Sequence, residues 1–579
     1  MTDARAATRR LVFDIEANGL VDLELTGKGE PKTIADRIHC ICAVDCDTGE
    51  KFSYGPNDME EAIALLDNAS MLIGHNIISY DLRILDRILD WRPLSSVKLF
   101  DTLLVGRLMY PDRTNLPLGL NSHSLRDWSQ FAGSHKDDYN GGWEEFSQEM
   151  LDYCLQDVVG NRAVAIKQGE FYRDNQPLIQ LETTVAQLCC EMADNGWGFD
   201  LDRAVEYEQQ LTLRSAELED ALRAAFPTIT EERWSEKTGK RLKDKVTIFN
   251  PGSSKQWAER LADKYGWVPE LTDSGNPIVD EVTLTNLSYP EAALGLEYRD
   301  INKKRGMLAD WILRCEQGTG VSIHGRTNSQ GTATGRASHS QPNLAQVPSD
   351  SQCRELFGPR DAGWTLVGCD LSGIELRCLA HYMKPFDGGA YAKEILEGDI
   401  HTANQNAAGL PTRNHAKTFI YALIYGAGDG KIGSIVEGNA RDGSTLKKKF
   451  FTALPALEKL IEKAQYRARK IGKLKMLDGR ACPVRQVRTA LNTLLQGAGA
   501  ILSKYWLVEA KRLLELNHPG LYRIHGWIHD ELQVSCPPDI ADSVGGLLVQ
   551  AALTAGDQLG FSMPMDAEYS HGKDWSCTH

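Results

Sequence analysis

The chain has 579 residues, 42% of them hydrophobic and 25% charged, which is an ordinary composition for a globular protein. At about 150 residues per domain, this length predicts roughly four domains. No uncharged apolar run of about 18 residues occurs, which excludes a membrane-spanning helix, and the first residues carry no signal-peptide pattern. We therefore expect a cytoplasmic protein.

The formal net charge of −15 counts against nucleic-acid binding only if the negative charge is spread evenly over the surface. Local basic clusters remain, and phosphate contacts need no more than such patches. The clusters lie at 237–245, 303–305, 447–449 and 467–475. Each cluster taken alone is more often a solvated face, so nucleic-acid binding stays open at this point.

The thirteen cysteines are scattered along the chain. The closest group, Cys40, Cys42 and Cys46, lies in a strand-like run that has no second half to complete a zinc site. We expect reduced, mostly buried thiols, as is usual in a cytosolic protein.

The pattern of apolar residues changes twice along the chain. Residues 1 to about 180 alternate strand-like and helix-like segments, which is typical of α/β structure. Residues from about 185 to 330 are mainly helical, with one helix running from Leu201 to Phe226, a polar segment that turns at Gly239, and Asn250 or Ser253 as the cap of the next helix. From 331 to the end, strands bracket a helical block at about 400 to 475.

Acidic residues interrupt the N-terminal segments at regular spacings. Asp14 and Glu16 lie two apart in a hydrophobic strand, so both carboxylates point to the same face. Two acids so close repel each other unless cations bind between them. Asp81 adds a third acid, and Tyr153 and Asp157 lie one helical turn apart. Taken alone, the strand is equally compatible with a half-exposed polar face.

Together these segments resemble the three motifs of the proofreading 3′→5′ exonuclease family, over roughly residues 10 to 165. The resemblance implies an RNase H-like fold in which four carboxylates hold two divalent ions and Tyr153 helps to orient the attacking water. Those carboxylates are Asp14, Glu16, Asp81 and Asp157. His75 and Asn76 either touch the substrate strand or support the turn in which they lie.

Two further aspartates end strand-like runs in the C-terminal half. Asp370 follows the run that starts at Leu366, and Asp530 follows the run that starts at Ile524. Mg²⁺ prefers hard oxygen ligands and takes few protein carboxylates, completing its shell with phosphates and water. Two aspartates that bridge two ions beside a nucleoside triphosphate are therefore chemically sufficient.

Between these aspartates, Arg413, Lys417, Tyr421 and Tyr425 recur every four residues, which puts them on one face of a helix. The two cations stand at the N-terminal end, where the helix dipole also favours negative charge such as a triphosphate. The alternative is an amphipathic helix whose tyrosines pack on a core. The aspartates on either side favour the first interpretation.

In this order, the segments resemble the catalytic core of family A (polymerase I-type) DNA polymerases. The resemblance implies Mg²⁺ at two sites, with Mn²⁺ as a possible substitute, the Leu371 carbonyl as a further metal ligand, and a supporting role for Glu531. It also implies that His401 contacts the triphosphate and that His529 contacts the primer terminus. Further DNA contacts are implied for Arg336, Asn343, Gln346, Asn492 and Gln496, in part through the minor groove.

Two side chains bear on the choice of nucleotide sugar. Glu375 lies five residues after Asp370, and by resemblance it lies under the incoming sugar. There, a carboxylate hydrogen-bonded to Tyr421 would crowd a 2′-hydroxyl. Tyr421 stands where many members carry Phe, which predicts ready acceptance of dideoxynucleotides.

Residues 372–381 and 416–428 are most similar to replicative polymerases of short-tailed phages of the T-odd coliphage type, which would place the protein in the host cytoplasm. Only a short segment separates Phe226 from Asn250, where that type carries a long thumb insertion that recruits thioredoxin. We therefore do not expect thioredoxin binding; primer-template DNA and deoxynucleotides are the expected partners of a monomer, with a replicative helicase-primase possible. The 237–245 cluster would then contact duplex phosphates directly.

The expected fold is multidomain, α/β and α+β: an exonuclease domain followed by a right-hand polymerase. The boundaries are 1–182 for the exonuclease, 183–330 for the thumb and connecting helices, 331–400 and 479–579 for the palm, and 401–478 for the fingers. Two alternatives remain, a single-subunit RNA polymerase relative and a primer-template recruitment protein with decayed sites. Glu375 and the complete exonuclease set count against the first, and the intact metal ligands against the second.

Overall fold

The structure is a computed structural model that describes residues 9–134 and 138–578. The chain forms two compact units. The larger comprises residues up to 198 together with 324–347 and 357–579, and the smaller comprises 199–323 with 348–356. In the described part of the chain, no helix combines the length and the apolar character that crossing a bilayer requires.

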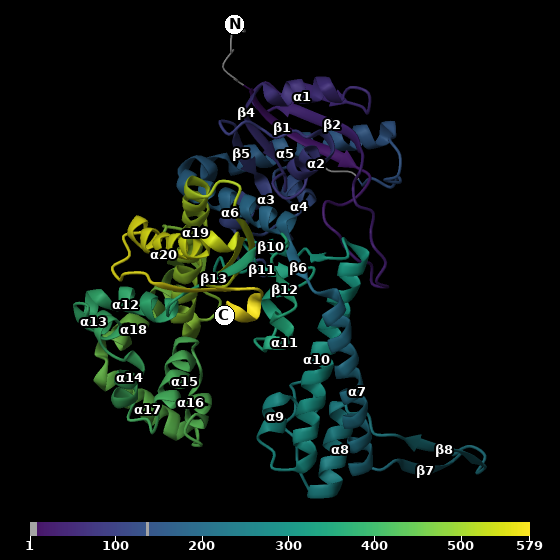
Figure 1. Cartoon of the computed structure of the whole chain (residues 1–579), viewed down its shortest axis with the longest axis vertical. Helices are drawn as coiled ribbons and strands as arrows, with labels where there is room; N and C mark the ends of the chain where they lie inside the picture. The colour runs from purple at the N-terminus through teal and green to yellow at the C-terminus, as the bar shows by residue number, and fades with distance from the viewer. Residues whose placement is uncertain (1–8, 135–137, 579) are drawn as a thin grey trace. The chain divides into compact units, whose positions relative to one another are not determined.

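The N-terminal part of the larger unit is built on a five-stranded sheet with the order β3-β2-β1-β4-β5 (Figure 1). Its central strand β1 pairs antiparallel with β2 and parallel with β4, and β2 is buried along its whole length. The α/β pattern predicted for this region is confirmed. The strands are β1 (Arg9–Ala17), β2 (Ile38–Asp45), β3 (Lys51–Tyr54), β4 (Ala69–Gly74) and β5 (Lys98–Asp101).

Helices follow and cover these strands, and the long helix α5 packs against β1 and β2. Helix α3 begins after Asp101, whose side chain caps it by accepting hydrogen bonds from two backbone N–H groups. The helices are α1 (Met59–Asp67), α2 (Asp81–Leu89), α3 (Thr102–Met109), α4 (Leu125–Phe131), α5 (Gln148–Asp174) and α6 (Gln176–Asn195).

The C-terminal part of the larger unit contains a four-stranded antiparallel sheet with the order β16-β17-β13-β18. Helix α20 packs against β13 and β18, and α19 packs against α20, so the sheet has an apolar layer behind it. The elements are β13 (Thr365–Leu371), α12 (Ile374–Asp387), α19 (Ala490–Asn517), β16 (Arg523–Ile528), β17 (Glu531–Cys536), α20 (Ala541–Gln558) and β18 (Ala567–Gly572).

The helical block predicted at about 400 to 475 is confirmed, and its apolar face continues the core of the sheet. It comprises α13 (Ala390–Glu397), α14 (Ile400–Ala408), α15 (Arg413–Ile424), α16 (Asp429–Ser434), α17 (Ala440–Ala453) and α18 (Pro455–Ile471). Short strands complete the unit: β6 (Trp197–Phe199), β10 (Arg326–Asn328), β11 (Ser338–Ser340), β12 (Phe357–Gly358), β14 (Lys473–Lys475) and β15 (Ala481–Pro483).

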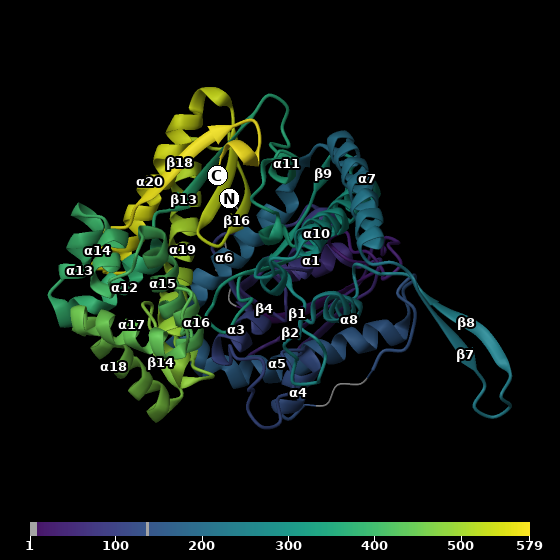
Figure 2. The same cartoon turned by 90° about the horizontal axis from the view of Figure 1, so that it is seen from below.

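The smaller unit is mainly helical, as predicted. Its long helices α7 and α10 run side by side (Figures 1 and 2). Ser253 caps α8 by accepting a hydrogen bond from the Gln256 N–H. Phe226, Phe249 and Trp257 form its apolar centre. The elements are α7 (Leu201–Ala225), β7 (Ile229–Trp234), β8 (Arg241–Thr247), α8 (Ser254–Tyr265), α9 (Glu281–Thr285), α10 (Pro290–Gln317), β9 (Ser322–Ile323) and α11 (Ser351–Arg354).

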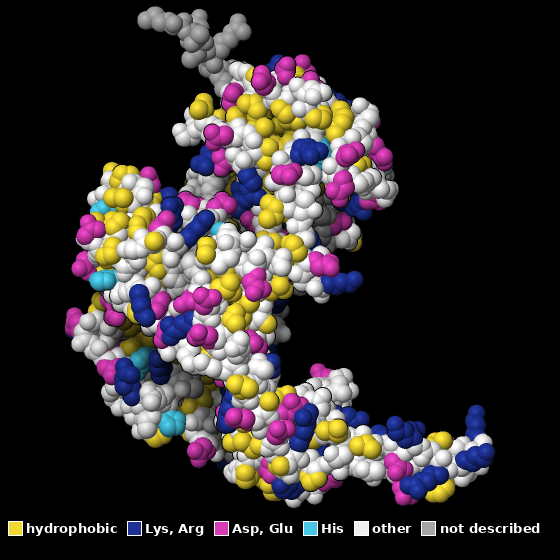
Figure 3. All heavy atoms as spheres, turned by 45° about the vertical axis from the view of Figure 1, so that its right-hand side comes forward, with side chains coloured by type: hydrophobic (Ala, Val, Ile, Leu, Met, Phe, Trp, Pro, Cys, Tyr) yellow, Lys and Arg dark blue, Asp and Glu magenta, His cyan; other side chains and the backbone are white. Residues whose placement is uncertain are grey.

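The polar segment that turns at Gly239 is a two-stranded hairpin, β7–β8, which extends away from α7 and α10 (Figures 1 and 2). Almost all of its side chains are exposed, and Lys and Arg side chains lie along it (Figure 3). The 237–245 cluster is therefore fully accessible to a partner. Sequence reasoning missed the two strands because they have no buried face and hence no apolar alternation.

Buried histidines predict how stability depends on pH. Burial lowers the pKa of His123 and of His525 to about 4, against an ordinary value of about 6.5. Between these values the unfolded chain binds more protons than the folded chain, so stability falls as the pH drops from about 6.5 towards 4. We expect a loss of up to about 1.4 kcal/mol per pH unit for each histidine, measured as the free energy of unfolding in urea at several pH values. A free energy that stays constant between pH 6.5 and 5 would contradict this.

Candidate active sites

Two aspartates that are distant in sequence meet at the end of the C-terminal sheet. Asp370 is the penultimate residue of β13, and Asp530 lies in the two-residue turn between β16 and β17. The register pairs Asp370 with Glu531, and the Leu371 N–H donates a hydrogen bond of 2.9 Å to the Asp530 carbonyl. The antiparallel ladder thus brings Asp370, Asp530 and the Leu371 backbone to the same end of the sheet.

The turn itself is strained. His529, its first residue, has φ = 60°, a left-handed conformation that side chains other than glycine rarely adopt. Such strain persists only where the surrounding structure holds it, and it is common at functional sites. Here the pairing of β16 with β17 fixes the turn and leaves the His529 side chain exposed.

The electrostatics of this site fit a divalent cation. Asp370 is exposed, whereas burial and then the negative charge of Glu375 raise the pKa of Asp530. A cation beside Asp530 would offset both effects and favour its ionised form. The donors are all oxygen, the ligand type that Mg²⁺ prefers.

Glu531 points elsewhere. Its buried carboxylate accepts hydrogen bonds from Trp575 Nε1 at 2.7 Å and from Gln533 Nε2 at 2.5 Å. These bonds tie the end of the sheet to the C-terminal segment. The geometry therefore suits the supporting role expected for this residue.

A cavity of about 230 Å³ opens beside Asp530. Arg336, Glu375, Tyr425 and His529 line it, so it gathers residues predicted from separate segments. Arg336 Nη2 lies 3.3 Å from Glu375 Oε1, and the Tyr425 hydroxyl donates to the same oxygen at 3.4 Å.

The expected hydrogen bond from Tyr421 to Glu375 is wrong in this structure, since the phenol that donates is that of Tyr425. Tyr425 ends α15 and is 42% exposed, which lets its side chain reach over the cavity. Tyr421 lies one turn earlier and packs partly against the core. Burial, and then the charge of Glu375, raise the pKa of Tyr421 to about 12, so its ring still lies near the carboxylate.

Helix α15 presents its cations as the sequence predicted. Thr412 caps it, Arg413 and Lys417 are exposed, and the residues of the opposite face are buried. Arg413 Nε pairs with Asp399 Oδ2 at 2.8 Å. His401 lies close by. Burial lowers its pKa, and the positive charges of Arg413 and Lys417 lower it further. Arg413 and Lys417 therefore supply the positive charge of this surface, and the lowered pKa of His401 favours a neutral ring beside them.

The remaining predicted DNA-contact residues do not line this cavity. Asn343 and Gln346 flank a short 3₁₀ turn, and Asn492 and Gln496 lie one turn apart on α19. The side-chain oxygens of Asn343 and Asn492 are buried without a hydrogen-bond partner among the described residues. Gln346 is exposed.

A second cluster forms on the N-terminal sheet. Carboxylate oxygens of Asp14 and Glu16 and the thiol of Cys154 lie within 4.8 Å of one another, an arrangement that could hold a metal ion. Cys154, on α5, also donates a weak bond of 3.5 Å to the Asp14 carbonyl. Sequence reasoning missed this cysteine, although its spacing of three from Asp157 places both on one helix face.

Asp81 and Asp157 stand outside that cluster of three. Asp81 begins α2, accepts a 3.2 Å hydrogen bond from the Ile15 N–H, and has its pKa raised to about 7 by burial. Asp157 is buried on α5, one turn after Cys154. Tyr80, which was not predicted as a site residue, lies among the acids. Burial raises its pKa, and the negative charges of Asp81, Glu16 and Asp14 raise it further.

Neighbouring aromatic and polar groups hold the surrounding segments. The ring of Tyr153 packs against those of Tyr139 and Trp143. The two ring nitrogens of His75 lie 3.0 Å from Thr102 Oγ1 and from the His123 carbonyl. These contacts favour the supporting role for His75, and Asn76 follows it in a left-handed conformation.

Comparisons with known proteins identify the family of this chain. The family described as DNA polymerase family A matches residues 224–577. The DNA-directed DNA polymerases of Escherichia phage T7 and Enterobacteria phage T3 are each 32% identical over 98% of this chain and 100% of their own length. The DNA polymerase I of Aquifex aeolicus (strain VF5) is 25% identical over 94% of this chain and 95% of its own.

Among solved structures, the polymerase domain of Pol1 from M. smegmatis, in complex with DNA primer-template and dNTP, has the same fold, with a TM-score of 0.79 at 18% identity. The match covers 99% of this chain and 97% of that one. The chain therefore belongs to DNA polymerase family A, and the predicted polymerase fold is confirmed.

Its activity is that of a DNA-directed DNA polymerase, and enzymes of this family use divalent metal ions, typically Mg²⁺. The RNA polymerase and recruitment alternatives are not supported. The alignment with the T7 enzyme spans 718 positions against 579 residues here, so that relative has residues without a counterpart in this chain.

Proposed function

We propose that this polymerase extends a primer 3′-hydroxyl on a DNA template by two-metal phosphoryl transfer and removes mispaired ends with a 3′→5′ exonuclease in the same chain. One observation carries the proposal: the larger unit has two separate acidic clusters, Asp370 with Asp530 on one sheet and Asp14 with Glu16 on another. Each consists of ligands suited to hard divalent ions.

In the polymerase site, Asp370, Asp530 and the Leu371 carbonyl would hold Mg²⁺, which supplies charge stabilisation at the reacting oxygens when bound. Arg413, Lys417 and His401 would bind the triphosphate. Arg413 then exchanges the Asp399 carboxylate for phosphate oxygens, which replaces one charge-assisted bond with another. Closure of α15 on a correctly paired nucleotide would add selectivity by induced fit.

In the exonuclease site, Asp14, Glu16, Asp81 and Asp157 would hold the metal ions, with Tyr153 orienting the attacking water. Asp81 supports this role because its buried carboxyl, with a raised pKa, would ionise fully only beside a cation. The Ile15 N–H fixes its orientation towards β1.

For the DNA, we assign Arg336, His529, Asn343, Gln346, Asn492 and Gln496 to contacts with primer and template. The buried, unpartnered side-chain oxygens of Asn343 and Asn492 need a donor, which a bound duplex or water would provide. The relatives from phages T7 and T3 support a role in phage genome replication, in the cytoplasm of the host. We further propose that the protein is a monomer and that it works without thioredoxin. A helicase-primase is a possible partner.

The test is a 5′-labelled primer on a DNA template with Mg²⁺. With all four deoxynucleotides we expect lengthening, and without them we expect shortening from the 3′ end. A chelator in excess should stop both. Lengthening without any shortening would leave the polymerase and remove the proofreading part of the proposal.

Glu375 is expected to select deoxynucleotides. Its carboxylate, held by Arg336 and Tyr425, would exclude a 2′-hydroxyl from the cavity beside Asp530. We predict that Glu375→Ala raises ribonucleotide insertion relative to deoxynucleotide insertion by about 10- to 100-fold, equivalent to ~1–3 kcal/mol. Single-nucleotide insertion kinetics measure this ratio.

Two control variants test whether the effect of Glu375→Ala is steric and whether it is specific to this position. Glu375→Gln keeps the volume but loses the charge, so it should retain most of the discrimination if exclusion is steric. Glu397→Ala removes an exposed glutamate of α13 and should change nothing. Sugar discrimination that survives Glu375→Ala would show that another side chain excludes the 2′-hydroxyl.

A further inference from the structure

A cavity of about 780 Å³ lies within the larger unit, beside the turn that leads to Asp81. It is bounded by the turn that precedes α2, by α3 and by the segment around β10 and β11. Four arginines line it: Arg83, Arg107, Arg113 and Arg326. They differ in whether a carboxylate neutralises them.

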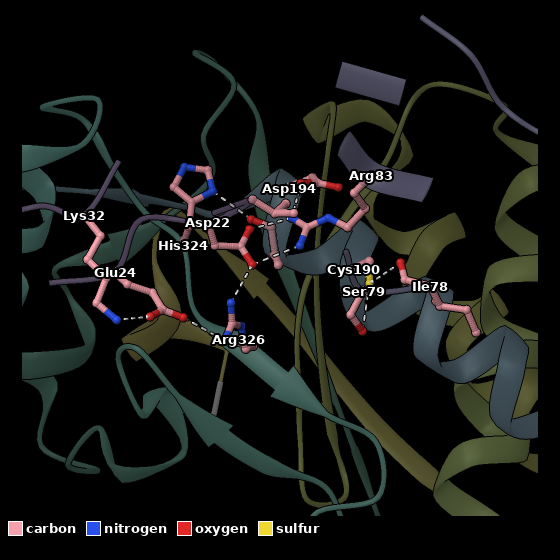
Figure 4. Close-up of polar contacts among 12 residues, drawn as sticks. Asp22, Glu24, Lys32, Ile78, Ser79, Arg83, Cys190, Asp194, His324 and Arg326 are labelled. Carbon is pink, nitrogen blue, oxygen red and sulfur yellow. Dashed lines mark hydrogen bonds and ion pairs between the residues drawn. The ribbon is translucent and has the colours of Figure 1, made fainter. Parts of the chain in front are cut away.

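Two of these arginines are already paired (Figure 4). Arg83 Nη2 lies 2.6 Å from Asp22 Oδ1 and 2.5 Å from Asp194 Oδ1. Arg326 bridges Asp22 at 3.4 Å and Glu24 at 3.1 Å. This side of the cavity is a closed ion-pair network that needs no further anion.

The other two contact only neutral oxygens. Arg107 Nη1 lies 3.4 Å from the Asn328 side-chain oxygen, and Arg113 Nη2 donates to the Gln330 carbonyl at 2.9 Å. Among the described residues, neither guanidinium forms an ion pair. Arg107 Nε is also buried and has no hydrogen-bond partner there.

The nearest carboxylates are engaged elsewhere. Asp101, at the start of α3, accepts hydrogen bonds from the backbone N–H groups of Asn76, Ile78, Leu103 and Leu104. Asp112, next to Arg113, is held by Arg485 at 2.7 Å. Burial, and then the charge of Arg113, lower the pKa of Arg107 to about 10. A partly buried cation such as Arg107, with no ion-pair partner among the described residues and a second cation beside it, is costly unless an anion joins it.

The position of Arg107 and Arg113 suggests which anion they bind. A small adjoining cavity is lined by Arg107, Arg113 and Gly335, and Gly335 precedes Arg336 of the polymerase site. The large cavity reaches Asn76 and Tyr80, in the turn that ends at Asp81 of the exonuclease site. A chain of phosphates that ran from one site towards the other would pass these guanidiniums.

We propose that Arg107 and Arg113 bind a phosphate group of single-stranded DNA, on the path of the frayed primer end to the exonuclease cluster. Guanidinium groups suit phosphate because their N–H donors match its oxygens in pairs. The amide oxygens that now contact both arginines are weak ligands that a phosphate displaces. This inference rests on the proposed exonuclease function, since that activity requires a single strand.

The experiment compares Arg107→Gln, Arg113→Gln and the matched variant Arg326→Gln, which removes a cavity arginine that already has carboxylate partners. Excision of a single-stranded oligonucleotide with Mg²⁺ gives KM and kcat, and fluorescence anisotropy gives the salt dependence of strand binding. For each of the first two variants we expect KM to rise about tenfold with kcat unchanged, and the salt slope to fall by about 1. Arg326→Gln and extension of a fully paired primer should match the wild type.

Arg113 is exposed, so Arg113→Gln keeps the test valid even if Arg107→Gln fails to fold. A deoxynucleoside monophosphate, the product of excision, is the other source of a phosphate. If inhibition by it weakens in the variants while KM for the strand stays constant, the site binds product and the path is wrong. Equal KM, salt slope and inhibition in all variants would overturn the proposal.

The inference and the proposed function fail separately. If the wild type binds single strands through these arginines but excises nothing, the proposed exonuclease is wrong and the proposed phosphate site is supported. If the wild type and both arginine variants excise equally well, the proposed exonuclease is supported and the proposed phosphate site is wrong.

Discussion

Asp530→Asn should reduce primer extension by roughly a thousandfold, about 4 kcal/mol of lost transition-state stabilisation, while leaving 3′→5′ excision unchanged. The amide cannot carry the negative charge that a divalent ion needs. The partial burial of Asp530 and the nearby charge of Glu375 make its charge costly without a cation. Pre-steady-state single-nucleotide incorporation measures the loss directly.

The substitution should spare the fold. The Leu371 N–H donates to the backbone carbonyl of Asp530, so the contact that closes the turn remains in the variant. Asp557→Asn, at an exposed position near the end of α20, is the matched control and should extend primers at the wild-type rate. If Asp530→Asn kept more than a tenth of the wild-type rate, Asp530 would not be a metal ligand.

The parts of this protein that sequence predicted are those fixed by local periodicity. Asp14 and Glu16 share a face because strand side chains alternate, and they do cluster in the structure. Arg413 and Lys417 share the exposed face of α15 because both follow the helical repeat. Ser253 caps α8 because its side chain satisfies a free N–H at the helix start.

The parts that sequence could not predict depend on how elements pack. Tyr421 and Tyr425 differ by one helical turn, and which of them reaches Glu375 depends on the placement of α15 against α12, which no local pattern specifies. Cys154 lies beside Asp14 and Glu16 only because α5 packs against β1. Arg107 and Arg113 lie in a segment without a motif, and only the packing around the cavity leaves them without an ion pair among residues 9–134 and 138–578.

Asp14→Ala should produce the opposite result to Asp530→Asn: excision falls by roughly a thousandfold and primer extension continues at the wild-type rate. Removing one carboxylate from the pair with Glu16 leaves too few hard oxygen ligands for two ions. Cys154 contacts both the backbone carbonyl of Asp14 at 3.5 Å and its carboxylate at 4.0 Å. Alanine retains the shorter of these contacts, so β1 and α5 should stay packed.

The two variants together separate the centres. Asp14 lies in the N-terminal sheet and Asp530 in a turn of the C-terminal sheet, so their effects on the two activities should be independent. Ser53→Ala, on the edge strand β3, is the control for a change within the same sheet. If Asp14→Ala also slowed extension of a fully paired primer, the two clusters would be coupled, and the assignment of one chemistry to each sheet would have to be abandoned.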